Sequence, residues 1–183
     1  MTPLSALDLQ KLGFECCIES GAGEAAGFTD AAYAEAGVEV IKTAAGLWKA
    51  ADIIAKVRAP NETELKRLNK SKTLISFFNP GGNEEGLELA KSKGATVIAM
   101  EMVPRISRAQ KMDALSSMAN IAGYRAVIEA GNNFDRFFTG QITAAGKVPP
   151  AKVLVVGAGV AGLAAIGTST SLGAVTYAFD VRP

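Results

Sequence analysis

The 183-residue chain contains no histidine. This absence excludes Ser-His-Asp triads, histidine-based general acid–base catalysis and histidine-ligated metal sites. Cysteine is almost as scarce, and the two that are present, Cys16 and Cys17, are neighbours. A disulfide between adjacent residues is strained, and two thiols are too few for a zinc site. We therefore interpret both cysteines as packed strand residues and predict no metal centre.

Aromatic residues are also few, at 7%, whereas apolar residues make up 49% of the chain. The core must therefore be built mostly from Ala, Val, Ile and Leu, which suits buried parallel strands covered by Ala-rich helices. Neither sign of charge is in excess, because 19 basic and 18 acidic residues give a net charge of +1. This balance provides no broad electrostatic field, so we predict no nucleic-acid partner.

No signal peptide is expected, because the first five residues contain neither a basic region nor an apolar one. One uncharged run, residues 153–179, exceeds the roughly 20 residues that a membrane-spanning helix needs. Five glycines and the polar residues 168–171 interrupt it. A strand, a helix and a second strand explain this run better than a membrane span does.

The N-terminal part of the sequence alternates short β-rich runs with helical stretches. The predicted strands are residues 14–18, 38–41, 53–57, 74–77 and 96–99, and the predicted helices are residues 5–12, 31–36, 47–50, 62–68 and 84–92. The predicted cap residues are Thr29 or Asp30 and Asn83 at N-termini, and Gly13, Gly37 and Gly94 after C-termini. Strands that alternate with helices predict a parallel, doubly wound α/β sheet.

A longer helix is predicted for residues 108–130, and small residues line one of its sides, which permits another helix to approach closely. Residues 132–147 are predicted to form a connector, closed by Pro149 and Pro150. Proline pairs do not continue a helix and commonly precede a new element. We therefore divide the chain into an N-terminal domain of residues 1–146, which includes the long helix, and a second domain that begins at residue 147.

The second domain contains only a strand (152–156), a helix (160–172) and a second strand (175–179). One β-α-β unit of about 30 residues cannot bury both faces of its strands. We therefore expect residues 147–183 to be the start of a larger domain. The predicted fold class is α/β, with two Rossmann-like domains built on doubly wound parallel sheets, of which the second is incomplete.

The first strand of the second domain runs into a G-x-G-x-x-G pattern formed by Gly157, Gly159 and Gly162. In such a loop the first glycine permits the tight turn, the second lets a pyrophosphate approach the backbone, and the third lets the helix pack closely on the strand. The helix N-terminus presents free N–H groups to the phosphates. Asp180 lies 18 residues beyond Gly162, where an acid can accept both hydroxyls of an adenine ribose. The pattern therefore predicts dinucleotide binding, with a structural glycine turn as the alternative.

The acid at the end of the second strand also predicts which dinucleotide binds. Asp180 favours NAD over NADP, because its charge would repel a 2′-phosphate. Arg182 stands close enough in the sequence to weaken this preference slightly.

A second glycine-containing loop, Gly21-Ala22-Gly23 with Gly27, also follows a predicted strand. We interpret this loop as structural. Its Glu24 would repel a phosphate, and its helix does not begin until about residue 29.

Polar side chains gather in residues 103–117, between the sheet of the first domain and the long helix. Arg105, Gln110, Asp113 and Ser116 belong to this run. A strand end followed by such residues predicts a polar cluster at the carboxyl edge of a parallel sheet, where ligands bind in open α/β folds. The alternative is the capped start of a helix.

Four runs of the sequence resemble the first domain of proton-translocating nicotinamide nucleotide transhydrogenases. They are residues 104–126, with Met112-Asp113-Ala114-Leu115-Ser116-Ser117, and residues 136–150, 19–25 and 56–60. The similarity covers nearly the whole chain. In that family the domain holds NAD(H) and passes a hydride to or from NADP(H) on a separate domain. The reaction is coupled to proton translocation through a membrane domain.

The resemblance implies roles for individual residues. Gln110 and Asp113 would be the catalytic residues, with Gln110 reaching toward the partner nucleotide, and Arg105, Asp113 and Ser116 would hold the nicotinamide end. The implied cofactor-binding residues are Arg105, Ile106, Ser107, Gln110, Asp113, Ser116, Gly157, Ala158, Gly159, Val160, Gly162, Asp180, Val181 and Arg182. Hydride transfer between two nicotinamides needs alignment of the rings and no general base, which is compatible with a chain without histidine.

The resemblance also implies partners and a location. The partners are the NADP(H)-binding and membrane domains of the same enzyme, together with a second copy in a homodimer. The location is the soluble face of an energy-transducing membrane, either the mitochondrial inner membrane or the bacterial plasma membrane. The family's domain opens with a strand before the Thr-Pro that is Thr2-Pro3 here, and it continues past Pro183. We therefore expect a fragment that is not active alone.

Two alternatives remain. Alanine dehydrogenases share this architecture and resemble the chain at Lys56-Val57, but that family has a catalytic histidine shortly after, where residues 74–80 here have none. The other alternative is a non-catalytic NAD-binding or interaction module.

Overall fold

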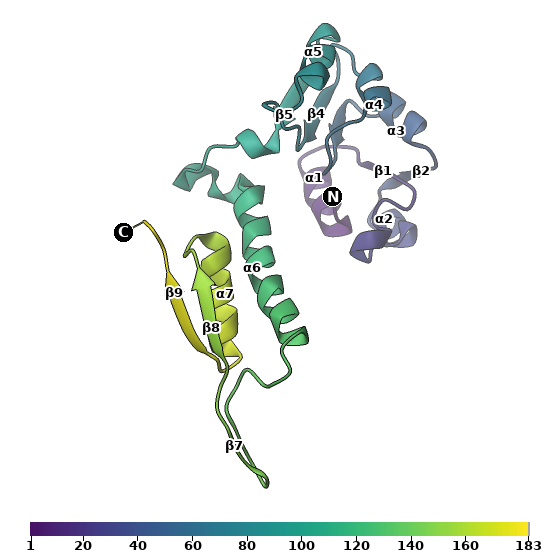
Figure 1. Cartoon of the computed structure of the whole chain (residues 1–183). Coiled ribbons are helices and arrows are strands. Elements are labelled where there is room, and N and C mark those ends of the chain that lie inside the picture. Colours follow the sequence, from purple (N-terminus) through teal and green to yellow (C-terminus); the bar gives the residue numbers. More distant parts are fainter. Residues whose placement is uncertain (183) are drawn as a thin grey trace. The chain divides into compact units, whose positions relative to one another are not determined.

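The computed structural model describes residues 1–182, which form two compact units that divide between Met102 and Val103. In both units parallel strands are connected by helices (Figure 1). This arrangement confirms the predicted α/β class with parallel sheets. The units divide earlier in the chain than the predicted domain boundary at residue 146, which stays a prediction.

The first half of unit 1 is a parallel pair of strands covered by helices. Its elements are α1 (Pro3–Lys11), β1 (Cys17–Glu19), the 3-10 helix η1 (Glu24–Ala26), α2 (Asp30–Glu35) and β2 (Glu39–Ile41). Thr29 caps α2 by accepting a hydrogen bond from the N–H of Ala32. Gly37 follows α2 with φ of +74°, as its position predicts. The core of this half consists of Ala6, Ile18, Tyr33 and Val38.

The second half of unit 1 is a three-stranded sheet. Its elements are α3 (Ala44–Ala50), β3 (Ile53–Ala55), α4 (Glu62–Lys66), β4 (Thr73–Ser76), α5 (Glu84–Ser92), β5 (Thr96–Ala99) and the 3-10 helix η2 (Met100–Met102). The strands are all parallel, in the order β3-β4-β5. A buried cluster that includes Trp48, Leu74 and Phe78 joins the sheet to its helices. Asn83 caps α5, as predicted.

Unit 2 contains one β-α-β unit and a long helix. Its elements are the 3-10 helix η3 (Ser107–Met112), α6 (Ala114–Asn132), β6 (Gln141–Thr143), β7 (Gly146–Val148), β8 (Lys152–Val156), α7 (Val160–Ser171) and β9 (Val175–Phe179). Helix α7 connects the parallel strands β8 and β9, and α6 packs against α7 (Figure 1). The two helices meet at Gly123, where a side chain would collide with the carbonyl oxygen of Ala161. The prediction of a close helix approach is therefore confirmed at this position.

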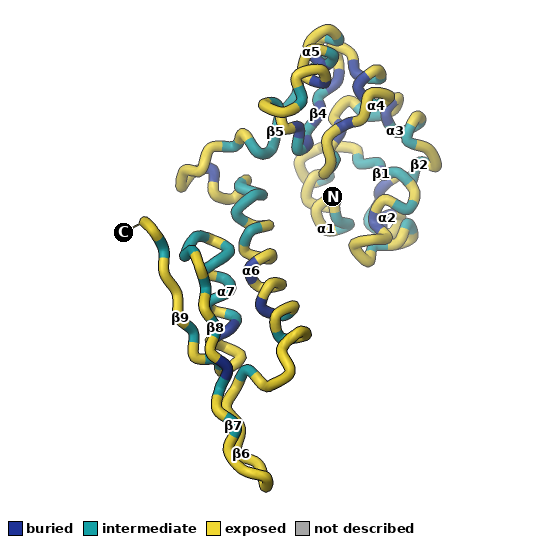
Figure 2. The backbone as a smooth tube through the Cα atoms, viewed as in Figure 1, coloured by how far each residue is buried: buried dark blue, intermediate teal, exposed yellow. Residues whose placement is uncertain are grey.

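Two predictions for unit 2 were wrong. The helix predicted over residues 108–130 is not continuous, because η3 ends at Met112 and Asp113 caps a new helix that begins at Ala114. The connector predicted over residues 132–147 contains the antiparallel hairpin β6–β7. Figure 2 shows this hairpin exposed almost along its length, and Ile142 is 88% exposed. Strands without a buried face lack the alternating apolar pattern by which strands are predicted.

The remaining predicted elements are present, with ends shifted by at most three residues. One of the largest shifts is at the first strand, which begins at Cys17, so that Cys16 lies just before it. Both thiols are free and half-buried. Short elements lose their end residues easily because fraying and capping decide the last turn or bridge.

One face of the β8–β9 pair is uncovered. Leu154, Val156, Tyr177 and Phe179 are each more than half exposed, as expected for a β-α-β unit that buries one face only. The uncharged run of residues 153–179 forms a strand, a helix and a strand, as predicted. No helix within residues 1–182 combines the length and the apolar character needed to cross a membrane.

Candidate functional site

The glycine loop of unit 2 joins β8 to the N-terminus of α7. Gly157 has φ of +97°, a conformation that favours glycine. A Cβ atom at Gly162 would collide with the carbonyl oxygen of Gly157, so only glycine lets α7 pack this closely on the strand end. Gly159 is the N-cap of α7 and provides no side-chain hydrogen bond to it. The first N–H groups of α7 are therefore left for an external acceptor, and an anion suits them.

Asp180 follows β9, and its carboxylate is hydrogen-bonded to the backbone of this loop. Its Oδ2 accepts a hydrogen bond of 2.7 Å from the N–H of Ala158, and its Oδ1 accepts one of 2.9 Å from the N–H of Arg182. The guanidinium of Arg182 also lies 3.4 Å from Oδ1 and reaches over Gly159. The hydrogen bonds from the Arg182 and Ala158 backbones, and then the Arg182 side chain, lower the pKa of Asp180 from 3.8 to about 2. The carboxylate is therefore ionised throughout the neutral range.

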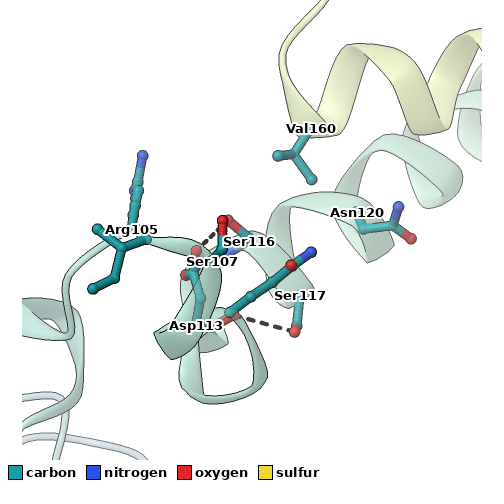
Figure 3. Close-up of a pocket in the computed structure, with 9 residues that line it drawn as sticks. Arg105, Ser107, Asp113, Ser116, Ser117, Asn120 and Val160 are labelled. Carbon is teal, nitrogen blue, oxygen red and sulfur yellow. Dashed lines mark hydrogen bonds between the residues drawn. The ribbon is translucent and has the colours of Figure 1, made fainter.

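A polar cavity of about 710 Å³ lies along the start of α6 (Figure 3). Seven predicted site residues line it; they are Arg105, Ile106, Ser107, Gln110, Asp113, Ser116 and Val160, the first residue of α7. The structure thus brings together most of the polar run that the sequence singled out. The other predicted residues do not line this cavity; they are Gly157, Ala158, Gly159, Gly162, Asp180, Val181 and Arg182, which belong to the glycine loop and the end of β9.

Asp113 and Ser116 are joined by hydrogen bonds in the wall of this cavity. The two oxygens of the Asp113 carboxylate accept hydrogen bonds from the N–H and the hydroxyl of Ser116, at 2.9 and 2.6 Å. These two bonds, followed by the nearby charge of Arg105, lower the pKa of Asp113. The alternative for this segment, a capped helix start, is therefore confirmed, and the carboxylate that caps α6 also lines the cavity.

Two further residues line the cavity, and the sequence analysis did not assign them a role. Ser117 and Asn120 lie on α6 beyond Ser116. Helical spacing carried a signal for them, because residues at i, i+3, i+4 and i+7 share one face of a helix, and Asp113, Ser116, Ser117 and Asn120 follow this spacing. The predicted helix of residues 108–130 already contained this spacing, but spacing alone does not show that Val160 of α7 completes the cavity.

The glycine-containing loop of unit 1 is occupied by contacts within the protein. The carboxylate of Asp30 accepts hydrogen bonds from the hydroxyl of Ser20 at 2.6 Å and from the N–H of Gly21 at 2.9 Å. A Cβ atom at Gly23 would lie 2.7 Å from the carbonyl oxygen of Phe28 and against the ring of Tyr33. Both observations agree with the structural interpretation of this loop.

Lys56 lies directly after β3, at the carboxyl end of the sheet of unit 1. Its ammonium group lies 2.6 Å from Oε2 of Glu64, and the two side chains are only 25% and 16% exposed. The same oxygen accepts a hydrogen bond from the N–H of Asn61, which completes the capping box of α4. The charge of Lys56 is thus neutralised within the protein.

The donors around the glycine loop and the polar cavity fit a dinucleotide. Free helical N–H groups suit a pyrophosphate, glycines without Cβ atoms allow it to approach, and Asp180 stands where a ribose is expected. Within residues 1–182 no three His, Cys, Asp or Glu side chains gather as metal ligands would.

Comparison with known families agrees with this geometry. Residues 1–122 match the family described as "Alanine dehydrogenase/PNT, N-terminal domain", and residues 126–183 match "Alanine dehydrogenase/PNT, C-terminal domain". The two matched regions meet within α6, which is the helix that contributes to both the polar cavity and the contact with α7.

Individual relatives point the same way. The chain is 77% identical over all its 183 residues to the NAD(P) transhydrogenase subunit alpha of Cereibacter sphaeroides, and it covers 35% of that protein. A solved transhydrogenase structure from Sinorhizobium meliloti is 47% identical with a TM-score of 0.93, over 100% of this chain and 54% of that one. The alanine dehydrogenase of Mycolicibacterium smegmatis is 31% identical, over 100% of this chain and 49% of that protein. The chain thus spans about a third to a half of the length of these relatives.

Proposed function

Because the chain belongs to the alanine dehydrogenase/PNT family, we propose that it forms the NAD(H)-binding part of a proton-translocating NAD(P) transhydrogenase. Relatives with 77% and 56% identity carry the name of the transhydrogenase alpha subunit, whereas the similarity to alanine dehydrogenase is much weaker, at 31%. The proposed reaction is hydride transfer between NAD(H) on this chain and NADP(H) on a separate domain, coupled to proton translocation.

One observation carries the proposal. The polar cavity combines Arg105, Gln110, Asp113 and Ser116 with Val160 at the N-terminus of α7. The glycine loop of the same unit leads into that N-terminus. A single extended ligand can therefore contact both groups of residues, with its pyrophosphate at α7 and its far end in the cavity.

The chemistry in this proposal is that of the cofactor, because the C4 carbon of a nicotinamide gives or accepts the hydride. The residues of the chain bind and orient. Arg105 and Asp113 hold the carboxamide end of the ring, with Asp113 fixed by Ser116. Gln110, which has an uncharged side chain in the wall of the cavity, reaches toward the second nucleotide. No group needs to take up a proton at the reacting carbons, which suits a chain without histidine.

The other half of the cofactor is assigned to the glycine loop. We propose that Gly159 and Val160 contact the pyrophosphate and that Asp180, with Ala158, Val181 and Arg182 around it, accepts the hydroxyls of the adenine ribose. The carboxylate of Asp180 stays ionised because its pKa is lowered to about 2, so it would repel the 2′-phosphate of NADP(H). This supports the choice of NAD(H) for this chain.

The proposal includes the partners and the place of action. They are an NADP(H)-binding domain, a membrane domain and a second copy of the chain. The place is the soluble face of a bacterial plasma membrane or a mitochondrial inner membrane. The names of the relatives support an alpha subunit that works with other domains.

The experiment that tests this function is an isotope transfer with the full-length protein and its NADP(H)-binding partner. NADPH deuterated at C4 is mixed with NAD⁺, and the nucleotides are separated and weighed by mass spectrometry. We expect deuterium in NADH and its loss when the partner is left out. If NAD⁺ stays unreduced although NAD(H) binds tightly, the chain would instead be a non-catalytic NAD-binding module.

The alanine dehydrogenase alternative is tested in the same preparation by adding alanine and NAD⁺ and measuring NADH and ammonium. We expect neither product. The lysine that resembles that family, Lys56, is already neutralised by Glu64, so it is not free to bind a substrate carboxylate.

A further inference from the structure

Asn120 is a polar residue of the site to which the proposed function assigns no role. It lies in the second turn of α6, is exposed, and lines the polar cavity beside Ser117 and opposite Val160 (Figure 3). Asp113 and Ser116 use their polar groups on each other. Asn120 lines the cavity at the end away from Asp113 and is exposed (Figure 3).

Asn120 also marks the end of the polar surface. A second cavity of about 530 Å³ continues between α6 and α7, and its lining is mostly apolar, with Ile121, Tyr124 and Leu172. Asn120 is the residue that both cavities share. Asn120 is therefore the polar residue of α6 at the boundary between the first cavity and the mostly apolar second cavity.

The place of Asn120 relative to the cofactor follows from its neighbours. Val160 is the first residue of α7, at the end expected to hold the pyrophosphate, and Asp113 begins α6 at the end expected to hold the nicotinamide. Asn120 follows Asp113 by seven residues on the same face of the helix and borders the cavity near Val160. Between the pyrophosphate and the nicotinamide of such a ligand lies one group, a ribose.

The chemistry of the carboxamide suits a ribose. An amide offers an acceptor oxygen and a donor NH₂, and each hydroxyl of a vicinal diol both donates and accepts, whereas a phosphate only accepts. We propose that Asn120 is a positioning residue that binds the hydroxyls of the ribose on the nicotinamide side. This inference rests on the proposed function and extends it to a residue for which that function gives no role.

The experiment compares three ligands that share a pyrophosphate. NADH and ADP-ribose contain the second ribose, and ADP does not. In calorimetric titrations of the full-length protein, Asn120→Ala should weaken binding of NADH and of ADP-ribose about tenfold, because one or two hydrogen bonds are lost. Binding of ADP should stay unchanged. A merely structural role for Asn120 would weaken all three ligands alike or lower the melting temperature.

Two further variants sharpen the test. Asn132→Ala removes an exposed asparagine from the same helix outside both cavities, and it should change none of the three affinities. Asn120→Asp keeps the shape and an acceptor for hydroxyls but repels phosphates, and it remains available if the alanine variant fails to fold. Relative to the unaltered protein, it should bind ADP equally well and keep most of the affinity for ADP-ribose. A loss of ADP affinity would show that the contact is to a phosphate and overturn the ribose assignment.

The outcomes separate this inference from the proposed function. If the unaltered protein binds neither NADH nor ADP-ribose, the proposed function fails and this inference with it. If it binds both and Asn120→Ala binds them equally well, the function stands and only the role of Asn120 is overturned.

Discussion

The loop after β1 and the loop after β8 both follow a parallel strand, and both contain a Gly-Ala-Gly sequence. Their first glycines, Gly21 and Gly157, both have positive φ values, of +77° and +97°. In both loops a carboxylate accepts a hydrogen bond from the backbone, Asp30 from Gly21 and Asp180 from Ala158. The two turns are therefore alike in their local chemistry.

The helices that follow make the difference. Helix α2 begins several residues after its loop, has six residues, and is capped by the hydroxyl of Thr29. Helix α7 begins directly at the loop, has twelve residues, and has glycine as its N-cap with no side-chain hydrogen bond. Unpaired N–H groups at a helix N-terminus need an acceptor. The first loop provides a side-chain cap for its helix, whereas the second leaves the first N–H groups of its helix without a side-chain acceptor.

The largest expected effect comes from adding a methyl group to the second loop at Gly162. Gly162→Ala places a Cβ atom against the carbonyl oxygen of Gly157, so α7 must move away from β8. We expect a loss of stability of about 1–3 kcal/mol from overpacking. The shifted helix N-terminus should weaken NADH binding on the order of a hundredfold. Calorimetry and thermal melting measure both effects.

The matched change in the first loop is Gly23→Ala, whose Cβ atom would lie 2.7 Å from the carbonyl oxygen of Phe28. It should destabilise unit 1 and leave the NADH affinity of the folded protein unchanged. Weakened NADH binding by this variant, or normal binding by Gly162→Ala, would contradict the contrast between the loops.

The next effect concerns the two carboxylates. Asp180→Ala removes the acceptor proposed for the adenine ribose and should weaken NADH binding on the order of tenfold or more. NADPH binding should suffer less, because the same change removes a charge that repels its 2′-phosphate. Asp30→Ala should leave both affinities unaltered. Equal losses of NADH and NADPH affinity in Asp180→Ala would refute the assignment of Asp180 as the selectivity residue.

A smaller effect separates binding from alignment. Gln110→Asn shortens the side chain proposed to reach the second nucleotide while keeping its amide. We expect hydride transfer to slow about tenfold, because reacting groups tolerate little misplacement, with NADH affinity nearly intact. Single-turnover transfer rates and NADH titrations of the reconstituted enzyme give the two values. A large loss of NADH binding would mean that Gln110 holds the cofactor of this chain.

The sequence predicted most elements of the fold because glycines and cap residues mark their ends. Gly13, Gly37 and Gly94 all adopt positive φ values after helices, as predicted. The hairpin β6–β7 was missed because none of its residues is fully buried, so no alternation of apolar and polar residues was present to detect it. The break at Asp113 was missed because the flanking sequence favours a helix on both sides, and only the hydrogen bonds to Ser116 show where α6 starts.

The candidate site was predictable where a sequence motif has a known physical reason for its spacing. The spacing of Gly157, Gly159 and Gly162 with Asp180 gave the loop, and the carboxylate does close onto Ala158. Asn120 could not be found in this way, since its place in the cavity depends on how α6 packs against α7. Spacing along one helix says nothing about the partner helix.

The smallest effect is on stability in acid, and it again compares Asp180 with Asp30. The pKa of Asp180 falls from 3.8 to about 2, chiefly through the backbone hydrogen bonds from Arg182 and Ala158, and the pKa of Asp30 is lowered by its bonds to Ser20 and Gly21. A lowered pKa in the folded state means that the unfolded chain binds protons more readily. The stabilisation is therefore complete above about pH 4 and is lost as the pH falls toward 2.

In the unaltered protein the urea concentration at the midpoint of unfolding should fall between pH 4 and pH 2. Asp180→Asn and Asp30→Asn should each make this fall smaller. The flattening should be larger for Asp180→Asn, because Asp180 accepts from two backbone N–H groups and a guanidinium, whereas Asp30 accepts from one hydroxyl and one backbone N–H. Circular dichroism follows the whole chain, and the fluorescence of Trp48, the single tryptophan, follows unit 1. An unchanged pH profile in Asp180→Asn would mean that the Asp180 carboxylate of the unaltered protein does not accept these hydrogen bonds in solution. The loop would then lack the conformation proposed to bind the ribose.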